Sequence, residues 1–336
     1  GTIAAHRRFE NMRWSAPFFL LAALLAPASE AQLTSEMLSG LTLRSIGPAN
    51  MSGRFVDIAV VEKDPYVYYA ASATGGVFKT ENNGVTFTPV FEREGAHSVG
   101  DIAVHPEKPE IVWVGTGERA NRQSSSWGDG VYKSIDAGKT WTHVGLRDSH
   151  HIGRIELHPT DPDVVYVAAM GHLWGNNEER GLYKSTDGGD TWTRVLFIDE
   201  MTGVVDVAMD PKNPDVLYAA AYQRQRKPFG FHGGGPGSGL FKSTDGGTSW
   251  TELRNGLPEG DYGRIGISLY RKDPRIVYVC IEQGSRYTAS TTYEERLAGI
   301  YRSEDGGESF THMSDWNPRP MYASQILVDP TDDQRI

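Results

Sequence analysis

The chain has 336 residues and a net charge of −10 at neutral pH, which argues against nucleic acid or an anionic membrane surface as a partner. Cys280 is its single cysteine, so the fold does not depend on a disulfide framework. The apolar neighbours of Cys280 indicate a small core residue.

The N-terminal segment has the features of a secretory signal. An apolar run follows Met12 and reaches Ala26, with a positive start and a small-x-small cleavage site that ends at Ala31. The run is too short for a comfortable membrane span. We therefore predict that residues 1–31 are upstream sequence and signal peptide, with cleavage after Ala31. The mature protein is then secreted or periplasmic, with no membrane span after cleavage.

Beyond the N-terminal segment one motif recurs and predicts the fold. It reads Ser/Thr-x-Asp-x-Gly-x-Thr/Ser-Trp/Phe, with its acidic position at residues 136, 187, 245 and 305 and a weaker copy that carries Asn82. The steps between these five positions are 54, 51, 58 and 60 residues. A period of about 50 to 60 residues is typical of a stack of similar small sheets.

Each repeat contains four predicted strands. A short apolar strand ends at a His-Pro or Asp-Pro turn such as His105-Pro106, because proline cannot donate to a sheet ladder. A β-branched and aromatic run such as residues 111–114 follows and indicates a central strand. The third strand leads into the motif, which is a hairpin turn, and Trp141 or its equivalent begins the fourth. This is the strand content of one propeller blade.

We therefore predict an all-β fold, a β-propeller of four-stranded antiparallel blades within residues 32–336. The repeats place full blades at about 41–92, 93–146, 147–197, 198–255 and 256–313, and a partial blade at 314–336. An incomplete arc of blades would leave sheet faces exposed. We expect these five full blades and the start of a sixth to belong to a ring of roughly seven or more, in contact with the rest of the same polypeptide.

The motif residues have structural roles in this prediction. The Asp carboxylate accepts backbone N–H groups across the turn, the Gly permits a positive φ, and the aromatic side chain packs between neighbouring sheets. The structural set is Asp136, Gly138, Trp141, Asp187, Gly189, Trp192, Asp245, Gly247, Trp250, Asp305, Gly307 and Phe310.

These motifs resemble the Asp-box, or bacterial neuraminidase repeat (BNR), of sialidases, sortilin-type receptors and xyloglucan-active endoglucanases. The resemblance covers roughly residues 41–336. With residues 44–48 and 72–78 included, it is strongest to large secreted bacterial proteins with sortilin-like or glycosyl-hydrolase-like repeats. In those families the Asp box is structural and lies away from the ligand, which implies the same here.

Propeller connectivity places the Pro turns and the Asp boxes on one face. The loops between second and third strands, and those between blades, lie on the other face, and variable loops on a rigid frame often hold binding sites. Their aromatic and Arg content suits a protein, peptide or glycan ligand, and loop packing around the pore is the alternative. The candidates are Arg119, Arg122, Trp127, His172, Trp174, Tyr222, Arg224, Arg226, Phe229, Phe231, His232, Arg286, Tyr287 and Tyr293.

A second candidate set lies on the innermost strands, where alternation directs polar side chains toward the pore mouth. Its members are Arg54, Asp57, Asp101, Arg154, Asp206 and Arg264. Sialidases hold a carboxylate with three arginines, which suggests catalysis. Hydrogen bonding between blades explains the same residues more economically.

Two functions stay open at this point. The first is a secreted propeller that binds a ligand through its loop-rich face, since no catalytic set can be assigned. The second is a glycoside hydrolase, xyloglucanase-like or sialidase-like, with catalytic residues partly outside this chain. The xyloglucan-active family carries an Asp where this chain has Ala73. We predict no cofactor and no metal site, because His150-His151 lacks a third ligand at useful spacing.

Overall fold

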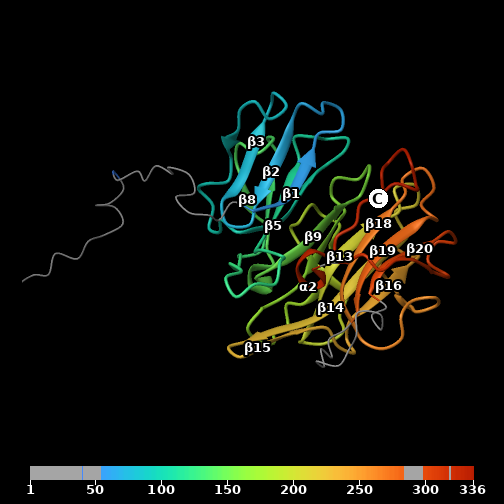
Figure 1. Ribbon diagram of the computed structural model, residues 1–336. Coiled ribbons are helices and arrows are strands. Elements are labelled where there is room, and N and C mark those ends of the chain that lie inside the picture. The colour runs from blue at the N-terminus through green and yellow to red at the C-terminus, as the bar shows by residue number, and fades with distance from the viewer. Residues whose placement is uncertain (1–39, 41–53, 284–297, 318) are drawn as a thin grey trace, which may run out of the picture. The chain divides into compact units, whose positions relative to one another are not determined.

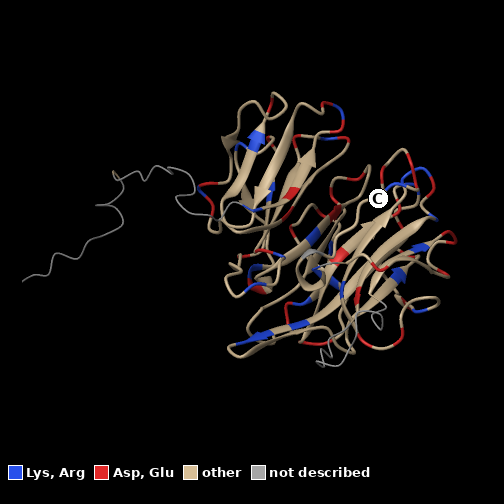
Figure 2. Ribbon diagram, in the orientation of Figure 1, with Lys and Arg blue, Asp and Glu red and all other residues tan. Residues whose placement is uncertain are grey.

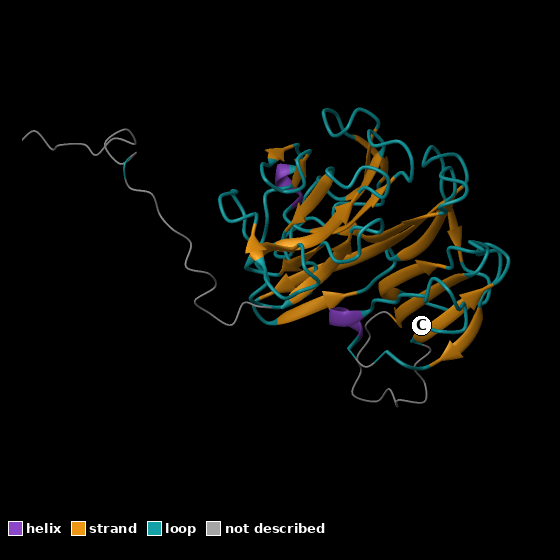
Figure 3. Cartoon of the chain, turned by 90° about the horizontal axis from the view of Figure 1, so that it is seen from above, coloured by secondary structure: helices purple, strands orange, loops and turns teal. Residues whose placement is uncertain are grey.

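The computed structural model describes residue 40 and residues 54–283, 298–317 and 319–336. Residues 46–336 form one compact unit, to which this description applies. Strands and loops dominate it, with a 3₁₀ helix η2 (Arg147–Ser149) and a short helix α2 (Pro320–Ala323) (Figure 3). No described helix is both long and apolar enough to cross a membrane.

Five antiparallel sheets follow one another along the chain, each with its strands in sequence order (Figure 1). Sheet 1 contains β1 (Phe55–Val60), β2 (Tyr68–Ser72), β3 (Gly76–Thr80) and β4 (Thr88–Pro89). Sheet 2 contains β5 (Val99–Val104), β6 (Val112–Thr116), β7 (Val131–Ser134) and β8 (Thr142–His143). Sheet 3 contains β9 (Ile152–Leu157), β10 (Val165–Ala169), β11 (Gly181–Ser185) and β12 (Thr193–Leu196).

Sheet 4 contains β13 (Thr202–Met209), β14 (Leu217–Lys227), β16 (Gly239–Ser243) and β17 (Thr251–Leu253). An added strand, β15 (Gly230–Gly233), pairs with the end of β14 and makes a hairpin. Sheet 5 contains β18 (Tyr262–Leu269), β19 (Val277–Gln283), β20 (Gly299–Ser303) and β21 (Thr311–Ser314). This organisation confirms the predicted all-β fold of four-stranded blades.

The hydrophobic core lies between the sheets. Each pair of successive sheets shares a cluster of buried apolar side chains, for example Tyr69 and Phe91 of sheet 1 with Ile102 of sheet 2. Trp113 with Ile155, Tyr166 with Val207, and Tyr218 with Ile267 occupy the later interfaces. The second strands of sheets 2 and 3 are buried on both faces, because each packs against a sheet on either side, which explains their nearly continuous apolar sequences.

The recurring motif forms a hairpin turn held by its own side chains. In sheet 2 the Ser134 Oγ accepts the Gly138 amide at 2.8 Å, and Asp136 Oδ1 accepts the Thr140 amide at 2.8 Å. Asp136 Oδ2 also accepts the Thr140 hydroxyl at 2.6 Å. Sheets 3, 4 and 5 repeat these bonds through Asp187, Asp245 and Asp305. One carboxylate thus satisfies donors that the turn would otherwise expose to solvent.

The motif glycine lies against an aromatic side chain of the preceding sheet. Gly189 has a φ of +97°, and a Cβ at this position would lie 2.9 Å from Cη2 of Trp113. Tyr69, Tyr166 and Tyr218 occupy the place of Trp113 in their sheets, and each hydroxyl donates to a main-chain oxygen of the next turn at 2.8–2.9 Å. Glycine is therefore required both for its backbone conformation and for the close approach.

Replacing Gly189 with Ala should lower the free energy of unfolding by about 1–3 kcal/mol, because the new Cβ meets Trp113 and the positive φ disfavours a side chain. Gly175→Ala is the matched control, since nothing lies within 4 Å of its Cβ position. Urea denaturation followed by tryptophan fluorescence measures both variants. Equal midpoints for the two would contradict the contact as described.

Acid should destabilise the protein through the motif carboxylates. Hydrogen bonds from the turn lower the pKa of Asp136, Asp187, Asp245 and Asp305 to about 2. A depressed folded-state pKa contributes stability that is complete above the unfolded value of about 3.9 and is lost as the pH falls toward 2. Urea midpoints measured from pH 6 to pH 2 should decrease as the pH drops below about 3.9. Asp187→Asn should make this decrease in the midpoint smaller. Asp190→Asn, in the same turn, should leave its slope unchanged.

Candidate functional site

The strand order defines two edges of the stacked sheets. In each blade, the connection between the first and second strands and the motif turn between the third and fourth strands lie at one edge. The connections between second and third strands and the segments between blades lie at the opposite edge, which we call the loop edge. A pocket of about 430 Å³ opens among the loops of sheets 1 to 3 at this edge. Its lining residues are Thr74, Gly95, Ala96, His97, Ser98, Ser126, Trp127, Gly128, Asp129, Arg147, Asp148 and His150.

An aromatic stack stands at the pocket. The Trp127 indole is 67% exposed, and its ring lies 6.1 Å from that of His150, nearly parallel at 24°. The His150 ring in turn stacks on His172, with 3.6 Å between centroids. We call Trp127, His150 and His172 the aromatic stack. It joins side chains from three separate segments of the chain, so its assembly depends on the packing of sheet 2 against sheet 3.

Main-chain bonds hold the aromatic stack in place. The Gly128 amide donates to the His150 carbonyl at 2.7 Å, which fixes the Trp127 segment beside His150. His150 itself has a φ of +57°, a conformation uncommon for a side chain of this size. Burial and the neighbouring His172 lower the pKa of His150. Its imidazole is therefore neutral at neutral pH, which permits face-to-face contact with a second imidazole.

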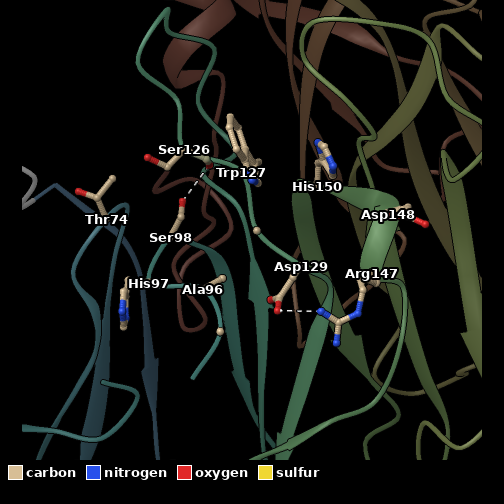
Figure 4. Close-up of a pocket in the computed structure, with 12 residues that line it drawn as sticks. Thr74, Ala96, His97, Ser98, Ser126, Trp127, Asp129, Arg147, Asp148 and His150 are labelled. Atoms are coloured by element: carbon tan, nitrogen blue, oxygen red, sulfur yellow. Dashed lines mark hydrogen bonds and ion pairs between the residues drawn. The ribbon is translucent and has the colours of Figure 1, made fainter. Parts of the chain in front are cut away.

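Polar groups line the pocket beside Trp127 and His150 (Figure 4). Asp129 accepts the Tyr132 hydroxyl at 2.8 Å and lies 3.4 Å from Nη1 of Arg147. Burial and the Asp129 carboxylate raise the pKa of Tyr132 to about 12. Glu94 is next to the lining residue Gly95, and burial and Asp129 raise the pKa of its carboxyl. The pocket therefore combines an exposed indole with carboxylate, guanidinium and hydroxyl groups.

A buried arginine supports the loop that carries His172 and Trp174. Arg180 is fully buried and donates to four main-chain oxygens, those of Met170, Met201, His172 and Gly175. Burial lowers the pKa of its guanidinium to about 10. Sequence reasoning did not single out Arg180, because an arginine in a charged loop gives no signal of burial. Arg147 was also missed, because nothing in its local sequence places it at the pocket that it lines.

Several predicted ligand-binding residues are instead interior. Arg119, Tyr222, Arg224 and Arg226 are all at most 7% exposed. Asn121 connects them, because its Oδ1 accepts from Arg224 at 2.6 Å and its Nδ2 donates to the Tyr222 hydroxyl at 2.8 Å. The loop over residues 118–122 thus reaches from sheet 2 to sheet 4. The structure places these residues in loop packing, the alternative considered from the sequence.

The predicted pore-mouth residues connect neighbouring sheets. The carboxylates of Asp57, Asp101 and Asp206 accept an inner-strand amide of a following sheet. The amides belong to Ile102, Ile155 and Ile267, at 3.4, 2.8 and 2.9 Å. Arg154 lies between Asp101 and Asp206, at 3.5 and 3.1 Å. Arg264 donates to the Arg119 carbonyl, and Arg54 pairs with the buried Glu118. Each of the six therefore contributes to contacts between sheets or loops.

The remaining candidates are divided between two surfaces. Arg122 and Trp174 are exposed on the loop edge. Phe229, Phe231 and His232 lie on the β14–β15 hairpin, along which Figure 2 shows basic positions. Arg286, Tyr287 and Tyr293 lie outside the described residues. Among the residues that the structure describes, no group of three His, Cys, Asp or Glu side chains could hold a metal ion.

The fold and its hairpin turns define the class of protein, an all-β propeller built from Asp-box repeats. The model for the Sortilin-Vps10 family (sortilin, neurotensin receptor 3) matches residues 129–297, half of the chain, and the chain belongs to this family. The family match therefore confirms the resemblance to sortilin-like repeat proteins that the sequence motifs indicated.

Curated relatives include xyloglucanases. Xyloglucanase Xgh74A of Acetivibrio thermocellus is 25% identical over 240 residues, which are 61% of this chain and 26% of that protein. A xyloglucanase of Hypocrea jecorina is 24% identical over 213 residues, 56% of this chain and 24% of that protein. The chain thus spans about a quarter of the length of these relatives.

Solved structures share the fold. The GH74 enzyme of Niastella koreensis aligns with a TM-score of 0.60 at 19% identity, over 83% of this chain and 43% of that chain. The GH74 xyloglucanase of Xanthomonas campestris gives a TM-score of 0.60 at 18% identity, over 83% of this chain and 42% of that chain. At this identity the likeness shows the fold alone.

Proposed function

We propose that the protein is a ligand-binding propeller whose pocket at the loop edge holds a glycan against Trp127. The observation that carries this proposal is the aromatic stack, which presents an indole to solvent beside a polar pocket. Burying a large apolar side chain stabilises a fold by roughly 1.5–3 kcal/mol, so an indole supported in an exposed position indicates a binding surface.

The chemistry of the pocket favours a sugar over a purely apolar ligand. A sugar ring has C–H faces that stack on an aromatic plane and a rim of hydroxyl groups that need hydrogen-bond partners. Trp127 offers the plane, and Asp129, Arg147 and Ser126 supply acceptors and donors within the same pocket. Ligand sites commonly combine an apolar surface with a few convergent polar groups. A peptide can use the same groups and is the alternative ligand.

We also propose that binding takes place outside the cytoplasm, in a secreted or periplasmic protein. The apolar run that ends at Ala26 and the cleavage motif ending at Ala31 support this compartment. The relationship to xyloglucanases supports a polysaccharide as the ligand class. This support is indirect, because xyloglucan is the substrate class named for a relative that is 25% identical over 240 residues.

Trp127→Ala should weaken binding to oligosaccharides by about tenfold to a hundredfold, because it removes the stacking plane. Titration calorimetry against xyloglucan, cellulose and bacterial cell-wall oligosaccharides measures the affinity. Trp316→Ala is the matched control, since Trp316 is equally exposed at 68% but does not line the pocket. Both variants should unfold at the temperature of the parent protein.

Two results would contradict the glycan proposal. The first is binding to no member of the panel. The second is oligosaccharide binding that Trp127→Ala and Trp316→Ala reduce equally. Binding of a peptide library, lost in Trp127→Ala alone, would place the site correctly and replace the glycan with a peptide.

A second candidate function, glycoside hydrolysis, rests on the Asp129 carboxylate that lines the pocket and on Glu94, the neighbour of the lining residue Gly95. Such reactions use one carboxylic acid to protonate the leaving oxygen and one carboxylate as base or nucleophile. Asp129 Oδ2 lies 2.7 Å from the point where a Cβ on Gly95 would stand, which brings the Glu94 backbone close to the Asp129 carboxylate. The raised pKa of Glu94 suits a general acid.

If the protein hydrolyses glycans at this pocket, Glu94→Gln and Asp129→Asn should each reduce the release of reducing sugar at least about a hundredfold. Asp148→Asn, at another residue that lines the pocket, should retain activity. Reducing-sugar release from xyloglucan and bacterial glycans is the measurement. Activity that survives in both Glu94→Gln and Asp129→Asn would exclude these two residues as the catalytic pair.

A further inference from the structure

Strand β14 is longer than its counterparts and carries an added strand. It contains 11 residues, whereas β2, β6 and β10 contain 5 each. The extra length pairs with β15 through the Pro228-Phe229 turn, and Figure 1 shows this part projecting away from the other strands of sheet 4. We call residues 224–233 the projecting hairpin. None of them lines the pocket.

Main-chain bonds to neighbouring loops hold the projecting hairpin in place. The Arg226 amide donates to the Leu173 carbonyl at 2.7 Å, and the Arg224 amide donates to the Met201 carbonyl at 3.3 Å. Both bonds lie on the side of β14 that faces away from β15. The hairpin is therefore supported along β14, and β15 is its outer strand.

The same bonds show which main-chain groups of β15 are available. In an antiparallel pair, consecutive residues direct their main-chain groups alternately toward the paired strand and away from it. Arg224 and Arg226 direct theirs away from β15, so the residues opposite them, Gly233 and Phe231, direct theirs away from β14. Phe231 thus presents an amide and a carbonyl at an open edge, and no residue that the structure describes bonds to them there.

The projecting hairpin is basic and carries an exposed aromatic residue at its tip. Phe229 is 87% exposed, and Lys227 and His232 are exposed close to it. The chain has no Asp or Glu between Asp215 and Asp245, although its net charge is −10. Figure 2 shows basic positions along the hairpin. An acidic partner would therefore meet no repelling carboxylate within the hairpin.

Arg226 adds a buried positive charge to the projecting hairpin. The residue is 7% exposed, and its guanidinium carbon lies 4.6 Å from the centre of the Phe231 ring. Its Nη2 donates to the Asn121 carbonyl at 3.4 Å, and its Nε has no hydrogen-bond partner among the described residues. Burial lowers the pKa of this guanidinium. Because a buried charge is costly unless it is paired, this arrangement favours an anionic partner.

We propose that β15 binds an extended acidic segment of another protein as an additional strand. The open main-chain groups of Phe231 supply the pairing, as in other cases of strand addition. A partner residue opposite Phe231 shares its face and is apolar. The residues on either side of it share the face of Lys227 and His232 and are acidic. Two copies of the hairpin would bring these basic side chains together, which disfavours pairing of β15 with itself.

A synthetic peptide of about seven residues in which Val and Glu alternate tests this proposal on the whole chain. Titration calorimetry should show binding that weakens as the salt concentration rises, and hydrogen exchange at the Phe231 amide should become slower in the complex. The same peptide with Lys in place of Glu should bind at least about tenfold more weakly. A peptide N-methylated at each Val, the residue expected opposite Phe231, should lose affinity to the same extent.

Two variants of the protein locate the binding site. Phe231→Pro removes the outward amide and keeps the bonds between β14 and β15, whereas Lys227→Glu reverses a charge. Each should weaken binding of the Val-Glu peptide at least about tenfold. Lys139→Glu is the matched control, because Lys139 is exposed in the motif turn of sheet 2, and it should bind as the parent protein does. Lys227→Glu keeps the test valid if Phe231→Pro lowers the unfolding temperature.

Absence of peptide binding, or equal binding of the N-methylated peptide, would overturn the proposal. Peptide binding that Lys227→Glu leaves unchanged would overturn it as well. Self-association through β15, or attachment to anionic vesicles that Phe229→Ala abolishes, in place of peptide binding, would assign the hairpin to a second copy or to a lipid surface.

Trp127→Ala separates this proposal from the glycan proposal. The variant should retain binding of the Val-Glu peptide, because the projecting hairpin does not line the pocket. Loss of peptide binding in Trp127→Ala would place the peptide in the pocket and overturn the assignment to β15. Failure of glycan binding in the parent protein would leave the peptide result unaffected.

Discussion

The structure depends on one repeated contact, in which a motif turn of one sheet packs on the second-strand aromatic residue of the sheet before it. The contact combines close approach, since Gly189 leaves room for the Trp113 ring, with hydrogen bonds from tyrosine hydroxyls to main-chain oxygens of the turn. The carboxylate within each turn keeps the turn rigid. Because this contact sets how successive sheets pack, it also positions the loops at the opposite edge, where the pocket lies.

The inner strands add a second, polar connection between sheets. Asp101 illustrates it, because its carboxylate bonds an amide of sheet 3 and also pairs with Arg119 at 2.9 Å. Burial and the nearby Asp57 carboxylate raise the pKa of Asp101 well above its ordinary value, although arginines oppose this shift. Such a buried network is stable only when its groups are satisfied, so it restricts the arrangement of the sheets. The loop over residues 118–122 is part of this network and is occupied by contacts within the protein. The exposed pocket is therefore the more suitable place for a ligand.

The pocket illustrates how a shared fold acquires a particular site. Family membership and the likeness to GH74 structures establish the propeller, but function belongs to the side chains that the loops present. Here the distinguishing feature is Trp127, supported by two histidines from different segments. Arg180 contributes indirectly, because its bonds to main-chain oxygens fix the loop that carries His172. A rigid support of this kind lowers the entropic cost of binding a ligand.

The sequence by itself determined the strand content, the repeat and the turns, because these depend on local patterns of apolar residues, Pro, Asp and Gly. It also placed Trp127 and His172 among the ligand candidates. Only the tertiary structure decided which candidates face solvent. Arg224 and Tyr222 are buried around Asn121, whereas Asp129, Arg147 and His150 line the pocket, and nothing in the local sequence separates these two groups. Burial of a loop side chain depends on contacts between segments more than 100 residues apart, such as those of Asn121 and Arg224, and no local pattern encodes them.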